Sequence, residues 1–372
     1  MKIRRRDRKK SIIIFFAMFC FLLSGLIFTE DFQKVKERII KSSWKRVGFI
    51  YIKPSILLKD VGYNSNIYYF DEEETPDWTA DAGLKVNFSA LLGKRFAIVI
   101  EESPYYSFYL ENKGLQNFNN IFSVNLYTYL GRFNLKYVYS KNSYLSRPTL
   151  EFGNRIITKN DNHLISVEYG NYNGFFIAIR ARQEYVNYDN SGYFEQYDVG
   201  SRLNRGKDTI TLTFNKVIFT RTLFFVKSEY YNLKFKTDTQ KNGSGGIFSA
   251  GIKFPEVSIV KGQFQIGVKY FTPENSAAEK YSKLNGSGNV SFRLTKKFSL
   301  GLSYSIDNMY SYFSPDQYFD LRRYTVSLNY YIGRNIKAGY SFSEGETIYK
   351  EITGIETGRK DRTLRSDFRL GL

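Results

Sequence analysis

The chain has 372 residues, of which 18% are aromatic, with 31 Tyr and 33 Phe but only 2 Trp. Its mean hydropathy of −0.38 excludes a polytopic helical membrane protein but allows a β-barrel, in which only alternate residues need be apolar. The formal net charge is +18, and seven Lys or Arg and one Asp in residues 2–10 leave the rest of the chain near +12. No nucleic-acid-binding motif accompanies this charge, so nucleic acid is not an expected partner.

The N-terminal segment has the features of a secretion signal. The basic stretch of residues 2–10 is followed by an uncharged apolar run that contains the single cysteine, Cys20. Because this order of basic and apolar residues is typical of signal peptides, we expect residues 1–29 to be one. No clear small-residue cleavage site follows the run, so an uncleaved anchor stays open as the alternative. Residues 30–46 are then predicted to be a short periplasmic lead-in.

From residue 47 onward the sequence shows a series of about sixteen strands separated by turn signals. We expect them at residues 47–58, 77–90, 95–110, 116–130, 132–144, 155–170, 173–188, 199–216, 219–236, 243–255, 261–273, 281–295, 297–311, 317–332, 334–349 and 360–372. These are much longer than the roughly five or six residues usual in soluble sheets. They are long enough for the roughly nine to eleven residues that a tilted strand needs to cross a bilayer.

Alternation within the strands and between their connections indicates the fold class. In residues 297–307 one parity carries only apolar and aromatic side chains, at Phe298, Leu300, Leu302, Tyr304 and Ile306. Very short turns alternate with long polar loops along the chain, as in outer-membrane barrels. Residues 47–372 are therefore predicted to form an all-β, transmembrane, antiparallel up-and-down β-barrel of about 16 strands (14–18). Its expected location is the outer membrane of a Gram-negative bacterium, with outer-membrane lipid and the barrel-assembly machinery as partners.

If the apolar parity faces lipid, the opposite parity predicts which charged residues line the lumen. The predicted cations are Lys53, Lys85, Lys136, Arg180, Arg182, Lys227, Lys253, Lys269, Arg293, Lys337, Arg365 and Arg369. The predicted anions are Asp81, Glu101, Glu168, Glu184, Glu229, Asp307 and Asp367. The excess of cations would concentrate anionic solutes. The alternative, which we favour slightly, is that these charges pair across neighbouring strands without conferring selectivity.

The sequence offers little for catalysis or for holding a cofactor or metal. Its single histidine, His163, shares the parity of Ile165 and Val167 and is expected at the outer rim rather than in an active site. The acidic residues 71–74, followed by Asp77, could hold Ca²⁺, but a solvated loop is the simpler interpretation. We therefore expect no enzymatic activity, no cofactor and no metal.

Three short motifs resemble the outer-membrane β-barrels grouped as beta-barrel porin type 2. They are Gly62-Tyr63-Asn64-Ser65-Asn66-Ile67-Tyr68 after the first strand, SRPTLEFGNRI at 146–156, and Arg-x-Arg-x-x-Tyr at 180–185. Some members of that family belong to exopolysaccharide loci. The resemblance thus implies polysaccharide export, with periplasmic export components as partners.

These observations lead to one leading functional prediction and one main alternative. The leading prediction is a porin or channel that passes polar, anionic solutes or exported polysaccharide. Tyr127, Tyr129 and Tyr231 on the lumen parity could stack against sugars, although a packing role is the simpler interpretation. The alternative is a non-conducting surface barrel whose loops bind ligands or surfaces. An outer-membrane enzyme and a soluble secreted β-protein are less favoured.

Overall fold

In the computed structural model the described residues are 30–65, 67, 75–148, 155–171, 173–189, 199–219, 222–254, 259–275, 280–295, 297–310, 318–332, 336–349 and 360–371. They form one antiparallel sheet of a short strand and sixteen long ones. The first strands are β1 (Lys45–Val47), β2 (Ile50–Asn64), β3 (Asp77–Leu92), β4 (Phe96–Tyr109), β5 (Asn117–Leu130) and β6 (Phe133–Ser146). Next come β7 (Ile156–Gly170), β8 (Phe175–Tyr188), β9 (Arg205–Ile218), β10 (Thr222–Phe235), β11 (Gly243–Phe254) and β12 (Val260–Pro273). The last are β13 (Tyr281–Arg293), β14 (Phe298–Tyr310), β15 (Tyr318–Ile332), β16 (Ile336–Tyr349) and β17 (Lys360–Gly371).

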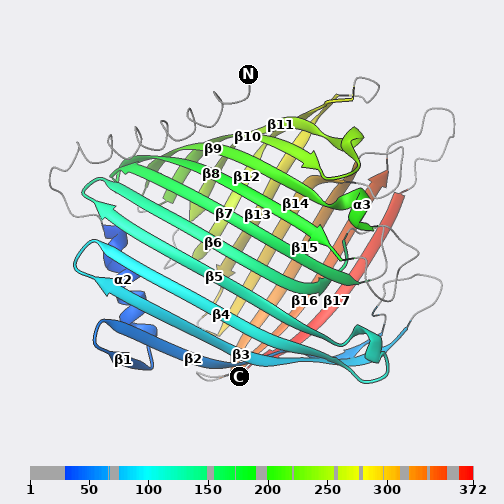
Figure 1. Cartoon of the computed structure of the whole chain (residues 1–372), viewed down its shortest axis with the longest axis horizontal. Coiled ribbons are helices and arrows are strands. Elements are labelled where there is room, and N and C mark those ends of the chain that lie inside the picture. Colours follow the sequence, from blue (N-terminus) through cyan, green and yellow to red (C-terminus); the bar gives the residue numbers. More distant parts are fainter. Residues whose placement is uncertain are drawn as a thin grey trace, which may run out of the picture.

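The long strands follow one another in an up-and-down order. Each strand from β2 to β16 pairs with the next in the chain through an antiparallel register. The sheet curls so that β2 to β9 cross the near wall and β12 to β17 pass behind them (Figure 1). Within the described residues no register joins β17 to β2, the two strands at the ends of the series. The up-and-down order of the sixteen long strands and the curl of the sheet confirm the predicted up-and-down β-barrel.

Helices are few and lie near the two ends of the barrel. They are α2 (Glu30–Ser42), α3 (Val199–Leu203) and two 3₁₀ turns, η1 (Lys113–Leu115) and η2 (Thr239–Lys241). None of the helices in the described part of the chain is both long and apolar enough to span a membrane. In Figure 1, α2 lies at the end with tight turns, and α3 lies at the end with long connections.

The tight turns are made by residues that suit a reversal of the chain. Gly93 between β3 and β4 and Gly131 between β5 and β6 have φ angles of +65° and +66°, which side chains with a Cβ rarely adopt. Short turns belong to the periplasmic end of such barrels and long loops to the extracellular end. The left end of Figure 1 is therefore periplasmic and the right end extracellular.

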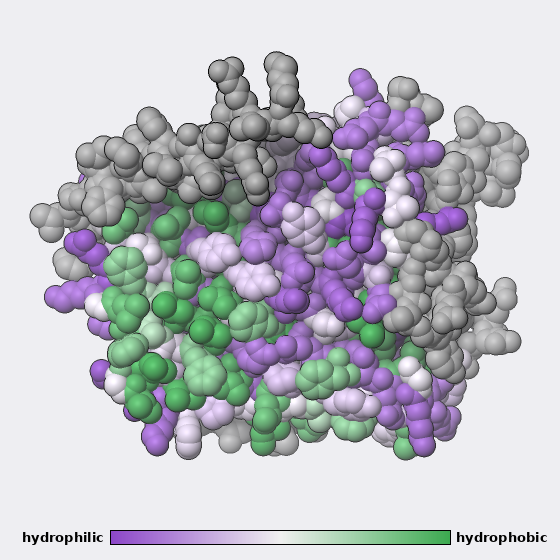
Figure 2. Space-filling view, in the orientation of Figure 1, coloured by the Kyte–Doolittle hydropathy of each residue, from purple (hydrophilic) through white to green (hydrophobic). Residues whose placement is uncertain are grey.

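The wall is apolar outside and polar inside, the reverse of a soluble sandwich. On β9, Ile210 and Phe214 are 59% and 42% exposed, whereas Thr211 and Thr213 are 9% and 6% exposed. On β14, Leu302 of the 297–307 segment is likewise 42% exposed. Green, apolar side chains cover mainly the periplasmic part of the near wall, and purple, polar ones cover the extracellular part (Figure 2). Such an apolar outer band is the surface that lipid covers.

The strand predictions were wrong in two places. The first barrel strand was expected at 47–58, but β2 continues to Asn64. An extra residue is accommodated between Lys59 and Gly62, where Asp60 has a φ of +52°, and the ladder to β3 then resumes. Part of the motif that resembles the porin family thus lies within the strand.

The second error concerns residues 199–203, which were expected to begin a strand and instead form α3. Val199 and Leu203 are four residues apart, so one helical turn places both on the same face. They are only 1% and 0% exposed. Burial of this apolar pair explains why the segment is helical.

Candidate pore interior

The strand registers bring predicted lining residues from distant parts of the chain onto one continuous line across the inner wall. One line of paired residues runs through Lys136, Ser166, Arg180, Thr211, Glu229, Ile247 and Lys269, across β6 to β12. Paired residues of neighbouring strands face the same side of a sheet. Four of the predicted lining residues therefore lie on one line of paired residues on the inner face of β6 to β12.

Ion pairs between strands occupy part of the inner wall. Lys85 Nζ lies 2.7 Å from Glu101 Oε1, and Lys269 Nζ lies 2.6 Å from Asp307 Oδ1. Arg180 binds Glu168 at 3.3 Å. These side chains stay partly exposed on the inner wall, so water reaches them and each pair contributes little stability, on the order of 0–1 kcal/mol.

A three-residue group shows an interior cation that the sequence prediction omitted. Glu229 lies 3.7 Å from Lys227 and 3.9 Å from Lys207. The Lys207 ammonium also lies 4.3 Å from the centre of the Tyr231 ring, within cation–π range. Lys207 follows the same parity as Thr209 and Thr211, and this alternation could have identified it.

Several interior cations remain after this pairing. Arg182, Lys253 and Arg293 are exposed, and no carboxylate of the described residues lies within ion-pair distance of them. Lys261 and Arg323, which the prediction also omitted, have the same inward parity and the same exposure. Among the predicted anions, Asp81, Glu101, Glu168, Glu229 and Asp307 are engaged in ion pairs. Glu184 stands opposite Lys207 in the register. The described interior therefore carries a surplus of accessible positive charge.

Small residues line one sector of the wall. On β14 the inward positions are Ser299, Gly301, Ser303 and Ser305, and on the neighbouring β15 they include Thr325, Ser327 and Asn329. Short side chains on these two strands leave room for water beside this part of the inner wall. A barrel of sixteen strands is wide enough for an aqueous channel.

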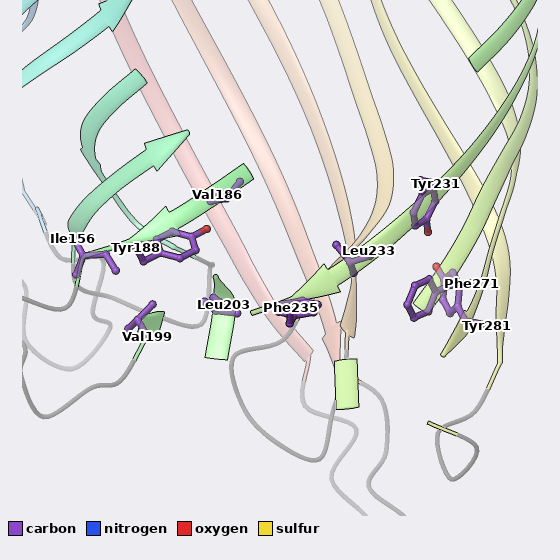
Figure 3. Close-up of a cluster of buried hydrophobic side chains, with 10 residues drawn as sticks. All are labelled: Ile156, Val186, Tyr188, Val199, Leu203, Tyr231, Leu233, Phe235, Phe271 and Tyr281. Carbon is purple, nitrogen blue, oxygen red and sulfur yellow. The ribbon is translucent and has the colours of Figure 1, made fainter. Parts of the chain in front are cut away.

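At the extracellular end, the β8–β9 connection folds into the mouth. Val199 and Leu203 of α3 join a cluster of inward-facing apolar side chains, which Figure 3 shows: Ile156, Val186, Tyr188, Tyr231, Leu233, Phe235, Phe271 and Tyr281. The Asn204 side-chain Oδ1 accepts a hydrogen bond from the Tyr188 backbone N–H at 2.6 Å. The Asn204 backbone carbonyl accepts another from the Lys236 backbone N–H at 2.8 Å. α3 is thus held between β8 and β10, where it narrows the mouth.

At the periplasmic end, α2 packs against the inner wall. Ile39, 6% exposed, and Val35 contact inward-facing side chains of β2 to β5, namely Tyr51, Leu91, Ala97, Val99, Tyr127 and Tyr129. The predicted lead-in of residues 30–46 therefore contains a helix that enters the mouth. Its apolar residues at positions 35 and 39 were the available sequence signal.

The tyrosines considered for sugar stacking take part in packing. Tyr129 is buried beneath α2 and Tyr127 borders the same cluster, with the Lys136 ammonium 5.2 Å from its ring. Tyr231, 1% exposed, belongs to the extracellular cluster. The geometry thus supports a packing role for these tyrosines rather than stacking against sugars.

Other predicted residues lie outside the interior or beyond what is described. His163 has the parity of the exposed Ile165, and its Nδ1 lies 3.1 Å from Tyr137 Oη. The side chains of Lys337, Arg365, Asp367 and Arg369 are outside the described residues, although their backbones pair within β15 to β17. Residues 1–29 and 71–74 are also outside them. In the described part of the chain no three His, Cys, Asp or Glu residues are grouped to hold a metal ion.

A continuous up-and-down succession of long strands, with an apolar outer band and a charged interior, defines an outer-membrane β-barrel. No protein-family model matches the chain, and no curated protein matches it.

Three solved structures illustrate the similarity to known proteins. The FrpB iron transporter from Neisseria meningitidis has a TM-score of 0.44 at 12% identity, covering 84% of this chain and 56% of that one. The siderophore receptor PirA from Acinetobacter baumannii has a TM-score of 0.44 at 11% identity, covering 88% of this chain and 58% of that one. The copper transporter OprC has a TM-score of 0.45 at 10% identity, covering 87% of this chain and 57% of that one. This chain matches less than two thirds of the length of each, and the function proposed below rests on its own residues.

Proposed function

We propose that the protein is a pore that passes small polar solutes across the outer membrane and prefers anions. The observation that supports this is the surplus of exposed interior cations, above all Arg182, Lys253 and Arg293, beside carboxylates that are already paired. A cationic lining raises the local concentration of anions and repels cations. The ion pairs shape the wall, and the unpaired cations provide the selectivity.

Export of a polysaccharide, which the resemblance to beta-barrel porin type 2 implies, is a more demanding form of the same proposal. A polymer chain needs a continuous wide path. α3 narrows the extracellular mouth and α2 occupies part of the periplasmic one. Passage of a polymer would therefore require one or both helices to move, whereas small solutes need only the sector of small residues.

The test is conductance in planar bilayers with a salt gradient. We expect stepwise currents and a reversal potential that shows anion preference. The triple variant Arg182→Gln, Lys253→Gln, Arg293→Gln should lower the anion-to-cation permeability ratio by about twofold or more, because it removes accessible positive charge. The control is Lys94→Gln with Lys113→Gln, which removes the charge of two exposed lysines outside the barrel interior. Absence of current from correctly folded protein would instead support the non-conducting surface barrel.

A further inference from the structure

Polar residues on the outer wall mark the upper edge of the apolar band. Towards the extracellular ends of β6 to β9 the outward positions change from apolar side chains to Lys141, His163, Gln183 and Asp208. Charged residues on the lipid face cost about 2–4 kcal/mol at the midplane and about 0–1 kcal/mol near the interface. This line of residues therefore lies at the level of the headgroups of the extracellular leaflet.

A hollow of about 540 Å³ lies on this line, on the lipid-facing side of the wall. Its lining comes from β5 to β8: Val124, Tyr137, Tyr139, Lys141, Asp161, His163 and Tyr185. The registers confirm that the lining shares one face, since Val124 pairs with Tyr139 and Tyr139 with His163. One step closer to the loops, Lys141 pairs with Asp161 and Asp161 with Tyr185.

The floor of the hollow is a rigid aromatic platform. The rings of Tyr139 and His163 lie 4.9 Å apart at 33°. His163 is further held by Tyr137, whose hydroxyl lies 3.1 Å from its Nδ1. Such rings offer flat faces to a sugar, whose axial C–H groups pack against aromatic surfaces.

The rim carries one acceptor and one donor without partners. Asp161 Oδ1 is buried and makes no hydrogen bond within the described residues. Lys141 is exposed, and although it stands opposite Asp161 in the register, no described carboxylate lies within ion-pair distance of its ammonium. A buried carboxylate oxygen without a donor is costly, so a ligand hydroxyl that displaces the side chains covering it would stabilise it. The Lys141 ammonium would at the same time bind an anionic group.

We propose that this hollow binds the phosphorylated sugar headgroup of a glycolipid in the extracellular leaflet. The sugar ring packs on Tyr139 and His163, its hydroxyls donate to Asp161, and its phosphate pairs with Lys141. Only a ligand that combines a ring, hydroxyls and an anion uses all of these groups. The proposal does not depend on whether the barrel conducts.

Native mass spectrometry of the folded, detergent-solubilised protein tests this assignment. The probes are lipid A with two phosphates, which carries sugars and anions, and phosphatidylethanolamine, which carries a phosphate and an ammonium but no sugar. We expect the unchanged protein to retain lipid A selectively. The double variant Lys141→Gln, Asp161→Asn should raise the apparent Kd for lipid A about tenfold, as expected for the loss of two charge-assisted contacts.

Two controls make the outcome decisive. Arg322→Gln changes an outward charge on β15, on another part of the wall, and should leave lipid A retention within twofold. Tyr139→Leu keeps an apolar side chain but removes the ring, and should weaken binding without altering heat-modifiable migration. Equal retention of the two lipids, or unchanged retention by the double variant, would overturn the proposal.

Discussion

Asp77 is a single buried carboxylate that anchors a whole connection. It is 2% exposed, and its Oδ1 accepts hydrogen bonds from the backbone N–H groups of Leu110 and Glu111 at 3.0 and 3.1 Å. Its Oδ2 accepts two more from Asn112, from the backbone at 2.8 Å and from the side chain at 2.9 Å. The first residue of β3 thereby fixes the chain between β4 and β5. From the sequence, Asp77 was expected to begin the strand at 77–90 and was considered as a Ca²⁺ ligand beside the acidic residues 71–74, with no role in holding another connection.

Asp77→Ala should therefore loosen the β4–β5 connection. Loss of the carboxylate leaves three backbone donors without their acceptor, at an expected cost of about 2–4 kcal/mol. The measurements are the free energy of unfolding in urea and the rate of protease cleavage between residues 110 and 116. Lys113→Ala, an exposed change in the same connection, is the control and should alter neither. Identical cleavage of the two variants would show that Asp77 does not hold this segment.

Two helices modify a barrel that the strands alone would leave open at both ends. α3 is held in the extracellular mouth by Asn204 and by the burial of Val199 and Leu203. α2 lies in the periplasmic mouth, where its buried side, Val35 and Ile39, meets the inner wall. Each helix buries a few apolar side chains, so both restrictions depend on local packing rather than on the ladders of the sheet.

Adjacent residues of α2 allow a matched test. Ile39 is 6% exposed against the wall, whereas Ile40 is 43% exposed on another side of the helix. Ile39→Glu should displace α2, because burial of an unpaired carboxylate is energetically unfavourable. Single-channel conductance should then rise. Ile40→Glu should leave conductance unchanged. If both variants conduct like the unchanged protein, α2 does not restrict the pore.

At the scale of the whole molecule, the two faces of every strand meet different solvents. On β12, Ile266 is 47% exposed on the outer face, and Gln263 is exposed on the inner one. The same alternation extends around the sheet because the registers keep paired residues on one side. Stability of the barrel thus depends on lipid outside and water inside.

Ile266→Arg should destabilise the barrel by about 2–4 kcal/mol in lipid vesicles, since it places a charge against hydrocarbon. Gln263→Arg, three residues away on the same strand, places the same charge in the hydrated interior and should cost much less. Urea titration of the folded fraction, followed by heat-modifiable migration, measures the difference. Equal destabilisation by both substitutions would contradict the assignment of the two faces.

Much of the fold could be predicted because alternation is a local property. Apolar residues at Phe298, Leu300 and Leu302 show the period-two alternation of a β-strand without reference to the rest of the chain. The predictions failed where another local force was stronger. Residues 199–203 prefer a helix that buries Val199 and Leu203, and an extra residue at Asp60 lets β2 continue where a long loop was expected.

The sequence by itself determined the class of architecture, the approximate strands and the parity on which each charged residue stands, since all three depend on neighbours along the chain. Only the tertiary structure decided which of these residues meet. Lys85 pairs with Glu101, and Lys269 pairs with Asp307, although these partners are 16 and 38 residues apart in the sequence. It also decided that α2 and α3 enter the two mouths and that a hollow opens beside His163. These contacts depend on strand pairing and chain reversal, which no single stretch of sequence contains.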